Sequence, residues 1–454
     1  MASSNEPAEP AVIEAWLAVS PGNVLEGHGD PLVHAAESFT RAHPGYEVRI
    51  RKVEAHLMPE VVAEAVAQGN PPDVAEYYAM STQTALDTRA ADGSPLFVPV
   101  ERAIAGRDKI LGEPVVVDDL VPALRAHYSV GGELVSVPSF VSTNVLCANQ
   151  DLLDRAGVER LPATWDELTA ACAAVAALPD GPAHCVSWPN YGWLFHMEIA
   201  GRGGLIGDNG NGRLGRATRV RLDTPEVLDY VRRWKQLQDD GYYLATEELH
   251  YVTAMQAFLA GEIAFVVSSS AVGKVVSDAA AEAGIELTVG QLPRYDARHS
   301  PGGVPGGSSF FVTAGLPKEK EDGALAFLQH QLNPEHAAAR MSAPSTPLTS
   351  LPITRAAYRQ AMAADWAEPF SGFRRAAEQV ASAEPTPAAA GPVLGNFNGI
   401  YTAIHEAIAD VVLRGADPAE RFRAATEQAQ AALDRHNAAA LADPPVTPAE
   451  LRAG

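Results

Sequence analysis

The sequence predicts an α/β protein with two domains, and three observations carry that prediction. Its 454 residues exceed the size of one ordinary domain. Of these residues, 47% are hydrophobic and 20% are charged, which is the balance of a chain that builds a substantial core. Short apolar runs alternate with amphipathic helical stretches in the N-terminal part of the chain. This alternation is typical of a parallel sheet covered by helices.

The elements of this alternation follow in order after a polar, Pro-rich tail at residues 1–10, which we expect to be disordered. Helices are predicted at 31–43 and 59–68, and the Gly-Asn pair after the second is a common helix end. Apolar runs predict strands at 12–17, 48–53, 73–78, 133–137, 145–148, 263–267 and 310–312.

Helix-start signals recur in the rest of the chain. Thr164-Trp165-Asp166-Glu167 is a capping box, in which the threonine hydroxyl accepts from the third helical amide. Thr224-Pro225-Glu226 places a proline in the first turn of another helix, and Asp417-Pro418 begins a long amphipathic one. A further helix is predicted at 318–331, and the C-terminal quarter reads as mostly helical.

Composition excludes several classes of function. Acidic residues outnumber basic ones 56 to 34, so a net charge of −22 repels nucleic acid and anionic membranes. No apolar run approaches the ~20 residues of a membrane-spanning helix. The chain lacks the nucleophile-elbow, zinc-protease and phosphate-loop motifs, and we predict neither a cofactor nor a metal ligand set. A pair of carboxylates for glycoside hydrolysis stays open, because sequence does not show spatial pairs.

Three cysteines and the N-terminal residues leave the compartment open. Cys147 follows an apolar run and is predicted to be buried and free, whereas Cys172 and Cys185 could form a disulfide in an oxidising space. Residues 1–10 contain no basic and apolar signal segment and no lipidation cysteine. Taken literally, this start predicts a cytoplasmic protein; the alternative is an extracytoplasmic lipoprotein whose signal segment is missing from the sequence.

Several segments, in order, resemble the family of extracellular solute-binding proteins that serve carbohydrate ABC importers. The similarity runs from about residue 11 to 437, and its strength lies in the order of individually weak motifs. These are Gly69-Asn70-Pro71-Pro72-Asp73-Val74, the segment from Asp151-Leu152-Leu153 to Gly157, the segment from Phe258 to Phe265, and Leu351-Pro352-Ile353-Thr354.

Within that family the chain is most similar to glycerol-3-phosphate-binding proteins, as Ser142-Thr143, Gly192-Trp193 and Leu394-Gly395-Asn396 indicate. The resemblance implies a periplasmic-binding-protein-like fold of the type II, maltose-binding-protein-like kind, with two lobes and a hinge. It places lobe 1 at 11–138 plus 269–309, and lobe 2 at 139–268 plus 310–454.

Candidate ligand contacts come from the same resemblance and from their residue types. Aromatic planes suit the C–H faces of sugars, and small polar residues at hinge breaks expose hydroxyls and amides. Trp188, Tyr191 and Trp193 lie among Pro, Asn and Gly in one short segment, with loop packing as the alternative for this cluster. The predicted ligand-binding residues are Tyr78, Ser142, Trp188, Trp193, Ser269, Ser270, Gly307, Ser308 and Ser350.

Two departures from the glycerol-3-phosphate pattern bear on the ligand. Val393 stands where an arginine is expected, and Ser350 stands where a tyrosine is expected. Losing a guanidinium removes a bidentate grip on phosphate, and losing a tyrosine enlarges the site. Both changes favour a neutral or larger hydroxyl-rich ligand over glycerol 3-phosphate.

The sequence thus predicts a monomeric, non-catalytic receptor that clamps a small carbohydrate-like solute and delivers it to ABC permease subunits. The alternative is a cytoplasmic enzyme or carrier that uses the same two-lobed fold, because fold does not fix function.

Overall fold

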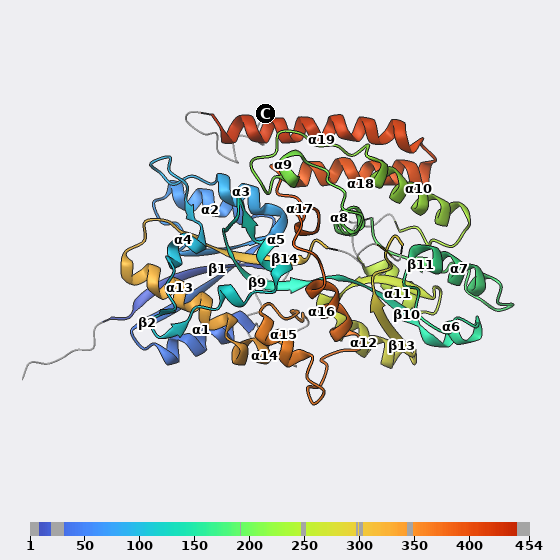
Figure 1. The fold of residues 1–454 in the computed structure, drawn as a ribbon, viewed down its shortest axis with the longest axis horizontal. Coiled ribbons are helices and arrows are strands. Elements are labelled where there is room, and N and C mark those ends of the chain that lie inside the picture. The colour runs from blue at the N-terminus through green and yellow to red at the C-terminus, as the bar shows by residue number, and fades with distance from the viewer. Residues whose placement is uncertain are drawn as a thin grey trace, which may run out of the picture.

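The computed structural model describes residues 9–19, 31–190, 192–246, 251–296, 298, 303–342 and 348–442. Two β-sheets lie at opposite ends of an elongated molecule, each covered by helices (Figure 1). The N-terminal strands form most of the first sheet, and the next strands form the second sheet. β14 (Gly306–Thr313) then joins the first sheet, and the C-terminal helices follow. The two-lobed α/β prediction is therefore confirmed. Most of the predicted tail, residues 1–8, lies outside the described residues.

The first sheet has six strands and combines parallel with antiparallel pairing. β1 (Ala11–Val19) lies between β2 (Tyr46–Glu54) and β3 (Val74–Tyr78), parallel to both. β14 then pairs antiparallel with β3, β4 (Phe97–Val98) and β9 (Val137–Ser142). The N-terminal part of the sheet is thus the predicted parallel alternation, and the returning strand β14 reverses direction.

The second sheet has four strands in the order β11-β12-β10-β13. β10 (Asn144–Asn149) is its buried centre and pairs antiparallel with β12 (Phe265–Ser269) and β13 (Leu287–Gln291). All six residues of β10 are buried, which explains why its sequence reads as a continuous apolar run rather than an alternating one. Two-stranded pairs complete the strands: β5 (Lys109–Ile110) with β6 (Glu113–Pro114), and β7 (Ser129–Val130) with β8 (Glu133–Leu134).

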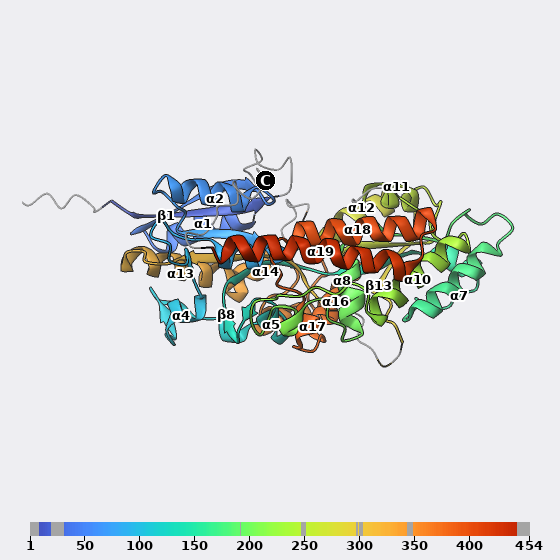
Figure 2. The same ribbon diagram turned by 90° about the horizontal axis from the view of Figure 1, so that it is seen from above.

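Helices cover both sheets. Those that the site or the arguments below use are α1 (Pro31–Ala42), α3 (Thr82–Asp87), α5 (Pro122–His127), α7 (Trp165–Ala176), α8 (Gly192–Gly201), α10 (Pro225–Asp239), α13 (Lys318–Leu332), α14 (Pro334–Ser342), α17 (Pro387–Ala390), α18 (Phe397–Arg414) and α19 (Pro418–Ala440). α18 and α19 lie together along one side of the molecule, and α19 extends from the second lobe toward the first (Figures 1 and 2). No helix in the described ranges combines the length and apolar character needed to cross a bilayer.

All three predicted helix starts occur, but only Thr164 and Asp417 cap their helices by side-chain hydrogen bonds; Thr224 makes no such bond before α10. Thr164 Oγ1 accepts from Glu167 N at 3.2 Å and begins α7, while Glu167 Oε2 accepts from Ala163 N at 2.7 Å. Asp417 Oδ1 accepts from Glu420 N at 2.8 Å and begins α19. Caps of this kind satisfy amides that the first helical turn leaves unpaired.

The predicted lobe boundaries differ from the observed sheets at three places. Residues 139–142 were predicted in lobe 2, yet they belong to β9, which pairs with β14 in the first sheet. β13 was assigned to lobe 1, yet it pairs with β10 in the second sheet. The second half of β14, from residue 310, and all of α13 were predicted in lobe 2, yet β14 pairs with β3 in the first sheet. The wrong assignment of β13 comes from the boundary between residues 268 and 269, which follows a strong strand at a polar break. Such a break ends a strand, but it does not show that the chain changes sheet.

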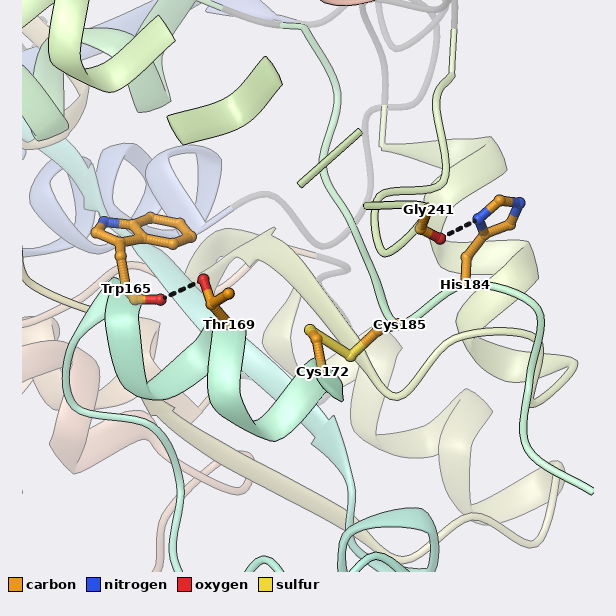
Figure 3. Close-up of a disulfide and its surroundings, with 6 residues drawn as sticks. All are labelled: Trp165, Thr169, Cys172, His184, Cys185 and Gly241. Atoms are coloured by element: carbon orange, nitrogen blue, oxygen red, sulfur yellow. Dashed lines mark hydrogen bonds between the residues drawn. A yellow bond between two sulfur atoms is a disulfide. The ribbon is translucent and has the colours of Figure 1, made fainter. Parts of the chain in front are cut away.

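A disulfide joins Cys172 on α7 to Cys185, just before β11 (Val186–Ser187), so the pairing that the sequence left open is present (Figure 3). Both residues are buried, their Cα atoms are 5.3 Å apart, and their sequence separation is 13. Cys147 is free and buried, as predicted. The disulfide therefore anchors the C-terminal end of α7 beside the edge strand of the second sheet.

Removing this disulfide should destabilise the protein measurably. A covalent loop of this length restricts the unfolded chain, which is worth about 3 kcal/mol. We expect the Cys172→Ala/Cys185→Ala double variant to lose about that much free energy of unfolding in denaturant titrations. Dithiothreitol should lower the stability of the wild type toward that of the double variant and leave the double variant unchanged. A wild type indifferent to reductant would contradict the prediction.

Candidate ligand-binding site

The two sheets meet where several chain segments cross between them. β9 (Val137–Ser142) leads directly into β10, and segment 348–352 runs alongside. Leu351 N donates to Val141 O at 2.8 Å, and Thr349 N donates to Ala271 O at 2.8 Å. Ser270 N donates to Thr143 O, also at 2.8 Å. We call this region, together with residues 303–308 before and at the start of β14, the junction. It is the hinge position of the two-lobed fold.

Glycines at the start of β14 let backbones approach closely at the junction. Gly307 has φ of 141° and lies opposite Val141; a Cβ there would lie 2.0 Å from Phe140 O. The register of β14 against β9 shifts at the next step, between Ser308 and Ser309. Such irregularities re-aim side chains at functional sites. Only glycine fits this position, because any side chain would collide with the neighbouring strand.

Trp193 lies against this glycine segment from the second lobe. It is the second residue of α8, and its Nε1 donates to Val304 O at 2.8 Å. A Cβ on Gly306 would lie 2.4 Å from Cζ2 of Trp193, so the indole packs directly on the Gly306 backbone. Val304 has φ of 51°, a strained conformation for a β-branched residue. Trp193 is partly exposed and therefore retains surface for a ligand.

Tyr78 and Ser308 lie opposite each other on β3 and β14, and behind them is a buried carboxylate. Glu76 Oε1 accepts from Ser308 Oγ at 2.6 Å and from Ser139 Oγ at 2.5 Å, while its Oε2 accepts from Ala18 N at 2.9 Å. Ser308 is thus committed to the protein interior, whereas Tyr78 at the strand end is partly exposed. Glu76 could not be identified from the sequence, because a single acidic residue in an apolar strand forms no recognisable motif.

The predicted serines divide into two groups. Ser270 Oγ accepts from Thr143 N at 3.0 Å, and Ser350 Oγ accepts from Val141 N at 3.1 Å; both are buried. These hydroxyls hold crossing segments together, which argues against a direct ligand contact. Ser142 lies opposite Gly306 and is also buried, but within the described residues no hydrogen bond to a crossing segment is assigned to its hydroxyl; Ser269, partly exposed, ends β12. These two remain candidates for contact with a solute.

Trp188 requires a correction. Its side chain is 1% exposed and packs against Trp165, Trp234 and Tyr243, with ring centroids 4.8 to 5.4 Å apart. It belongs to the core of the second lobe, so packing, the alternative reading of the aromatic segment, holds for Trp188 and no face is left to stack on a ligand. Tyr191, the third aromatic of that segment, lies outside the described residues. The junction therefore brings together eight of the nine predicted residues, all but Trp188.

A buried arginine that sequence reasoning missed fixes the segment before Val393. Arg213 Nε donates to Gly391 O at 2.8 Å, Nη2 to Ala390 O at 2.5 Å, and Nη1 to the carbonyls of His127 and Ser129 at 2.5 and 3.1 Å. Burial lowers the pKa of Arg213 to about 9. Its guanidinium is taken up by four backbone carbonyls. Val393 itself is buried, and its N donates to Asn211 O at 2.8 Å.

An ion-pair cluster also links the lobes away from the junction. Asp87, at the end of α3, hydrogen bonds to Arg216 and accepts from His436 Nε2 on α19 at 2.8 Å. Burial alone would raise the pKa of Asp87, but the hydrogen bonds from His436 and Arg216 outweigh burial, and the pKa lies below its usual value. The C-terminal end of α19 is thereby tied to the first lobe.

Two α/β lobes joined by several crossings, with aromatic, hydroxyl and glycine residues at the hinge, define the class of two-lobed solute-binding proteins. The chain belongs to the family of bacterial extracellular solute-binding proteins, whose family model matches residues 34–370. It is accordingly the solute-binding component of an ABC importer and not an enzyme, so the receptor prediction is confirmed over its cytoplasmic-enzyme alternative.

Individual relatives support the same placement. The sn-glycerol-3-phosphate-binding periplasmic protein UgpB of Brucella melitensis is 28% identical over 326 residues, covering 69% of this chain and 72% of the relative. UgpB of Salmonella paratyphi A is 26% identical over 421 residues, covering 90% and 91%. The similarity to the glycerol-3-phosphate-binding group that the sequence indicated is thus confirmed.

Solved structures share the fold at low sequence identity. The sugar-binding protein MalE from Xanthomonas citri superposes with a TM-score of 0.72 at 17% identity, covering 94% of this chain and 98% of that structure. UgpB from Mycobacterium tuberculosis in complex with glycerophosphocholine gives 0.62 at 17% identity, covering 94% and 99%. The maltose-binding-protein-like fold is confirmed.

Proposed function

We propose that this protein clamps a neutral, hydroxyl-rich solute, such as an oligosaccharide or polyol, at the junction between its lobes. The observation that carries the proposal is the make-up of the partly exposed junction residues, Tyr78, Trp193, Ser269 and Gly307. They offer an aromatic plane, hydroxyls and backbone amides without a counter-charge. Such groups satisfy sugar hydroxyls and C–H faces.

The surroundings of Val393 argue against a phosphate ligand. The relatives named for sn-glycerol 3-phosphate raise that ligand as the second candidate. A phosphate would need a guanidinium or ammonium group at short range. The arginine beside this segment is Arg213, and its donors are occupied by carbonyls of residues 127, 129, 390 and 391. The net charge of −22 adds a long-range field of the wrong sign for an anion.

Isothermal titration tests the ligand class. Candidates first come from a thermal-shift screen over sugars, polyols and phosphodiesters, since a ligand that binds only the folded state raises the melting temperature. We expect a neutral solute to bind at least about tenfold more tightly than glycerol 3-phosphate, the factor that one missing charged hydrogen bond accounts for. Micromolar binding of glycerol 3-phosphate without any response to sugars or polyols would overturn the proposal.

Trp193 is expected to carry a large share of the binding energy. Replacing it with alanine removes an aromatic plane at the junction, and a truncated aromatic anchor costs about 2 kcal/mol, or roughly thirtyfold in affinity. The measurement is titration with the solute that the screen identifies. Trp193→Phe should lose less, because it keeps a ring and gives up only the hydrogen bond to Val304 O.

A matched tryptophan serves as the control for that loss. Trp366 is partly exposed and packs on Phe373 with a centroid distance of 5.2 Å. Trp366→Ala should leave affinity unchanged. Wild-type affinity in Trp193→Ala, or equal losses in the two alanine variants, would remove Trp193 from the ligand site.

The remaining features of the proposed function concern partners and location. We infer that the protein acts as a monomer, hands its solute to ABC permease subunits, and is tethered outside the cytoplasm as a lipoprotein. Family membership supports the extracellular setting, and the buried disulfide suits an oxidising space. Small-angle scattering should show a smaller radius of gyration when the solute closes the lobes.

A further inference from the structure

Two histidines and a glutamate from three separate segments converge in the first lobe. His43 follows α1, Glu113 begins β6, and His330 lies in the last turns of α13. Glu113 Oε1 is 2.9 Å from His43 Nε2 and 2.8 Å from His330 Nδ1. The three donor atoms lie within 4.8 Å of one another. Sequence spacing could not reveal the cluster, since 70 and 217 residues separate Glu113 from its two partners.

The residues around these three side chains hold their ligand atoms in place. The side chains of His43, Glu113 and His330 are only 17%, 12% and 5% exposed. The ring of Phe39 lies against both imidazoles, with centroid distances of 4.5 and 5.6 Å. His330 Nε2 is 3.1 Å from Ser38 Oγ, so the second ring nitrogen has a partner that fixes the ring and leaves Nδ1 facing the carboxylate. Second partners of this kind orient metal-binding histidines.

We propose that His43 Nε2, His330 Nδ1 and Glu113 Oε1 form a binding site for a divalent transition-metal ion of the zinc class. Imidazole nitrogens with one carboxylate suit zinc, whereas calcium and magnesium take oxygen ligands. Metal–ligand bonds of about 2.0–2.2 Å in a tetrahedral site separate ligand atoms by about 3.3 Å. The observed contacts of 2.8 and 2.9 Å must therefore open by only about 0.5 Å to admit the ion. Water completes the fourth position.

The ion would tie together parts of the first lobe that the chain order separates. α1 precedes every strand of the second sheet in sequence, whereas α13 follows them all. A metal bound across His43 and His330 links these two helices and the β5–β6 hairpin. A metal that binds only the folded state stabilises it by mass action. Since all three ligands lie in the first lobe, the ion stabilises that lobe and not the junction.

The test uses the full chain stripped with EDTA and titrated with zinc chloride in a non-chelating buffer. We expect one zinc ion per chain by calorimetry, with micromolar or tighter affinity, and a higher melting temperature on binding. His43→Ala and Glu113→Gln should each weaken binding at least about tenfold. Glu113→Gln guards against misfolding, because it keeps the shape and polarity of the side chain.

The control removes an imidazole elsewhere. His56, whose side chain is 56% exposed beside Glu54, gives His56→Ala, which should bind zinc as the wild type does. A tetrahedral visible absorption spectrum with cobalt in place of zinc, lost in His43→Ala, would support the ligand set independently. The proposal is overturned if the wild type binds no zinc at zinc concentrations on the order of 100 micromolar, or if both ligand variants keep wild-type affinity.

Discussion

Replacing Arg213 with methionine should cost about 4 kcal/mol of unfolding free energy, the largest loss we expect from one substitution. Four carbonyl oxygens, those of residues 127, 129, 390 and 391, would lose the Arg213 donor, and among the described residues only that of residue 390 keeps a second partner, His127 Nδ1 at 2.7 Å. Each buried acceptor left without a partner costs about 1–3 kcal/mol. Part of that sum is recovered, because methionine does not carry the cost of burying a guanidinium. The measurement is equilibrium denaturation with urea.

An exposed arginine of the same segment provides the comparison. Arg219→Met changes the same side chain at the surface and should alter stability by less than about 0.5 kcal/mol. Arg213→Lys keeps the charge but not the planar fork, so an intermediate loss is expected. Equal stability of the Arg213→Met and Arg219→Met variants would show that the four carbonyls find other partners.

The position of Arg213 also bears on the ligand. It joins the end of α5 and the start of β7 to the 390–391 turn, and Val393 follows two residues later. The protein thus uses an arginine here as an internal support. The occupied guanidinium of Arg213 supports the neutral ligand class proposed above.

The fold could be predicted from sequence because its signals are local. The capping box at Thr164 and the Asp417-Pro418 start each fix a helix end by their own hydrogen bonds, and both occur as expected. The parallel alternation through β3 follows from apolar periodicity. Lobe boundaries are different in kind, since they depend on which distant strand accepts β13 or β14 as a neighbour.

The residues of the candidate site show the same difference between local signals and long-range contacts. Gly307 and Trp193 were recognisable because a glycine at a hinge and a tryptophan beside Gly192 are visible in a short segment. Trp188 was misjudged, since the same short segment cannot show that Trp165 and Trp234 enclose it. Glu76 and Arg213 were missed because each is a single charged residue whose partners come from elsewhere in the chain.

A buried glutamate on α8 should make a contribution to stability that is lost as pH rises from 5 to 8. Glu198 is 5% exposed, and its Oε2 accepts from Trp165 Nε1 at 2.7 Å. Burial raises its pKa from 4.5 to about 8, although Arg202 and the Trp165 hydrogen bond act in the opposite direction. Between these two values the unfolded chain is ionised at Glu198 while the folded chain still holds the proton.

The sign of the effect follows from proton linkage. Stability falls with pH wherever the folded state binds more protons than the unfolded state. The contribution of Glu198 is therefore fully present below about pH 4.5 and is lost as pH rises through about 8. The displacement of this pKa corresponds to a loss of roughly 3.5 kcal/mol between pH 5 and pH 8.

Glu198→Gln isolates this contribution, because glutamine has the shape of the protonated acid and cannot ionise. Its stability should match the wild type near pH 5 and exceed it by roughly 3 kcal/mol at pH 8, measured by denaturant titration at each pH. Glu159→Gln, at an exposed position, should leave the wild-type pH dependence intact.

Since α8 also carries Trp193 in its first turn, ionisation of Glu198 loosens the helix that supports the proposed ligand contact. Solute affinity in the wild type should then weaken toward alkaline pH and stay level in Glu198→Gln; parallel pH profiles for the two proteins would show that Glu198 does not titrate in this range.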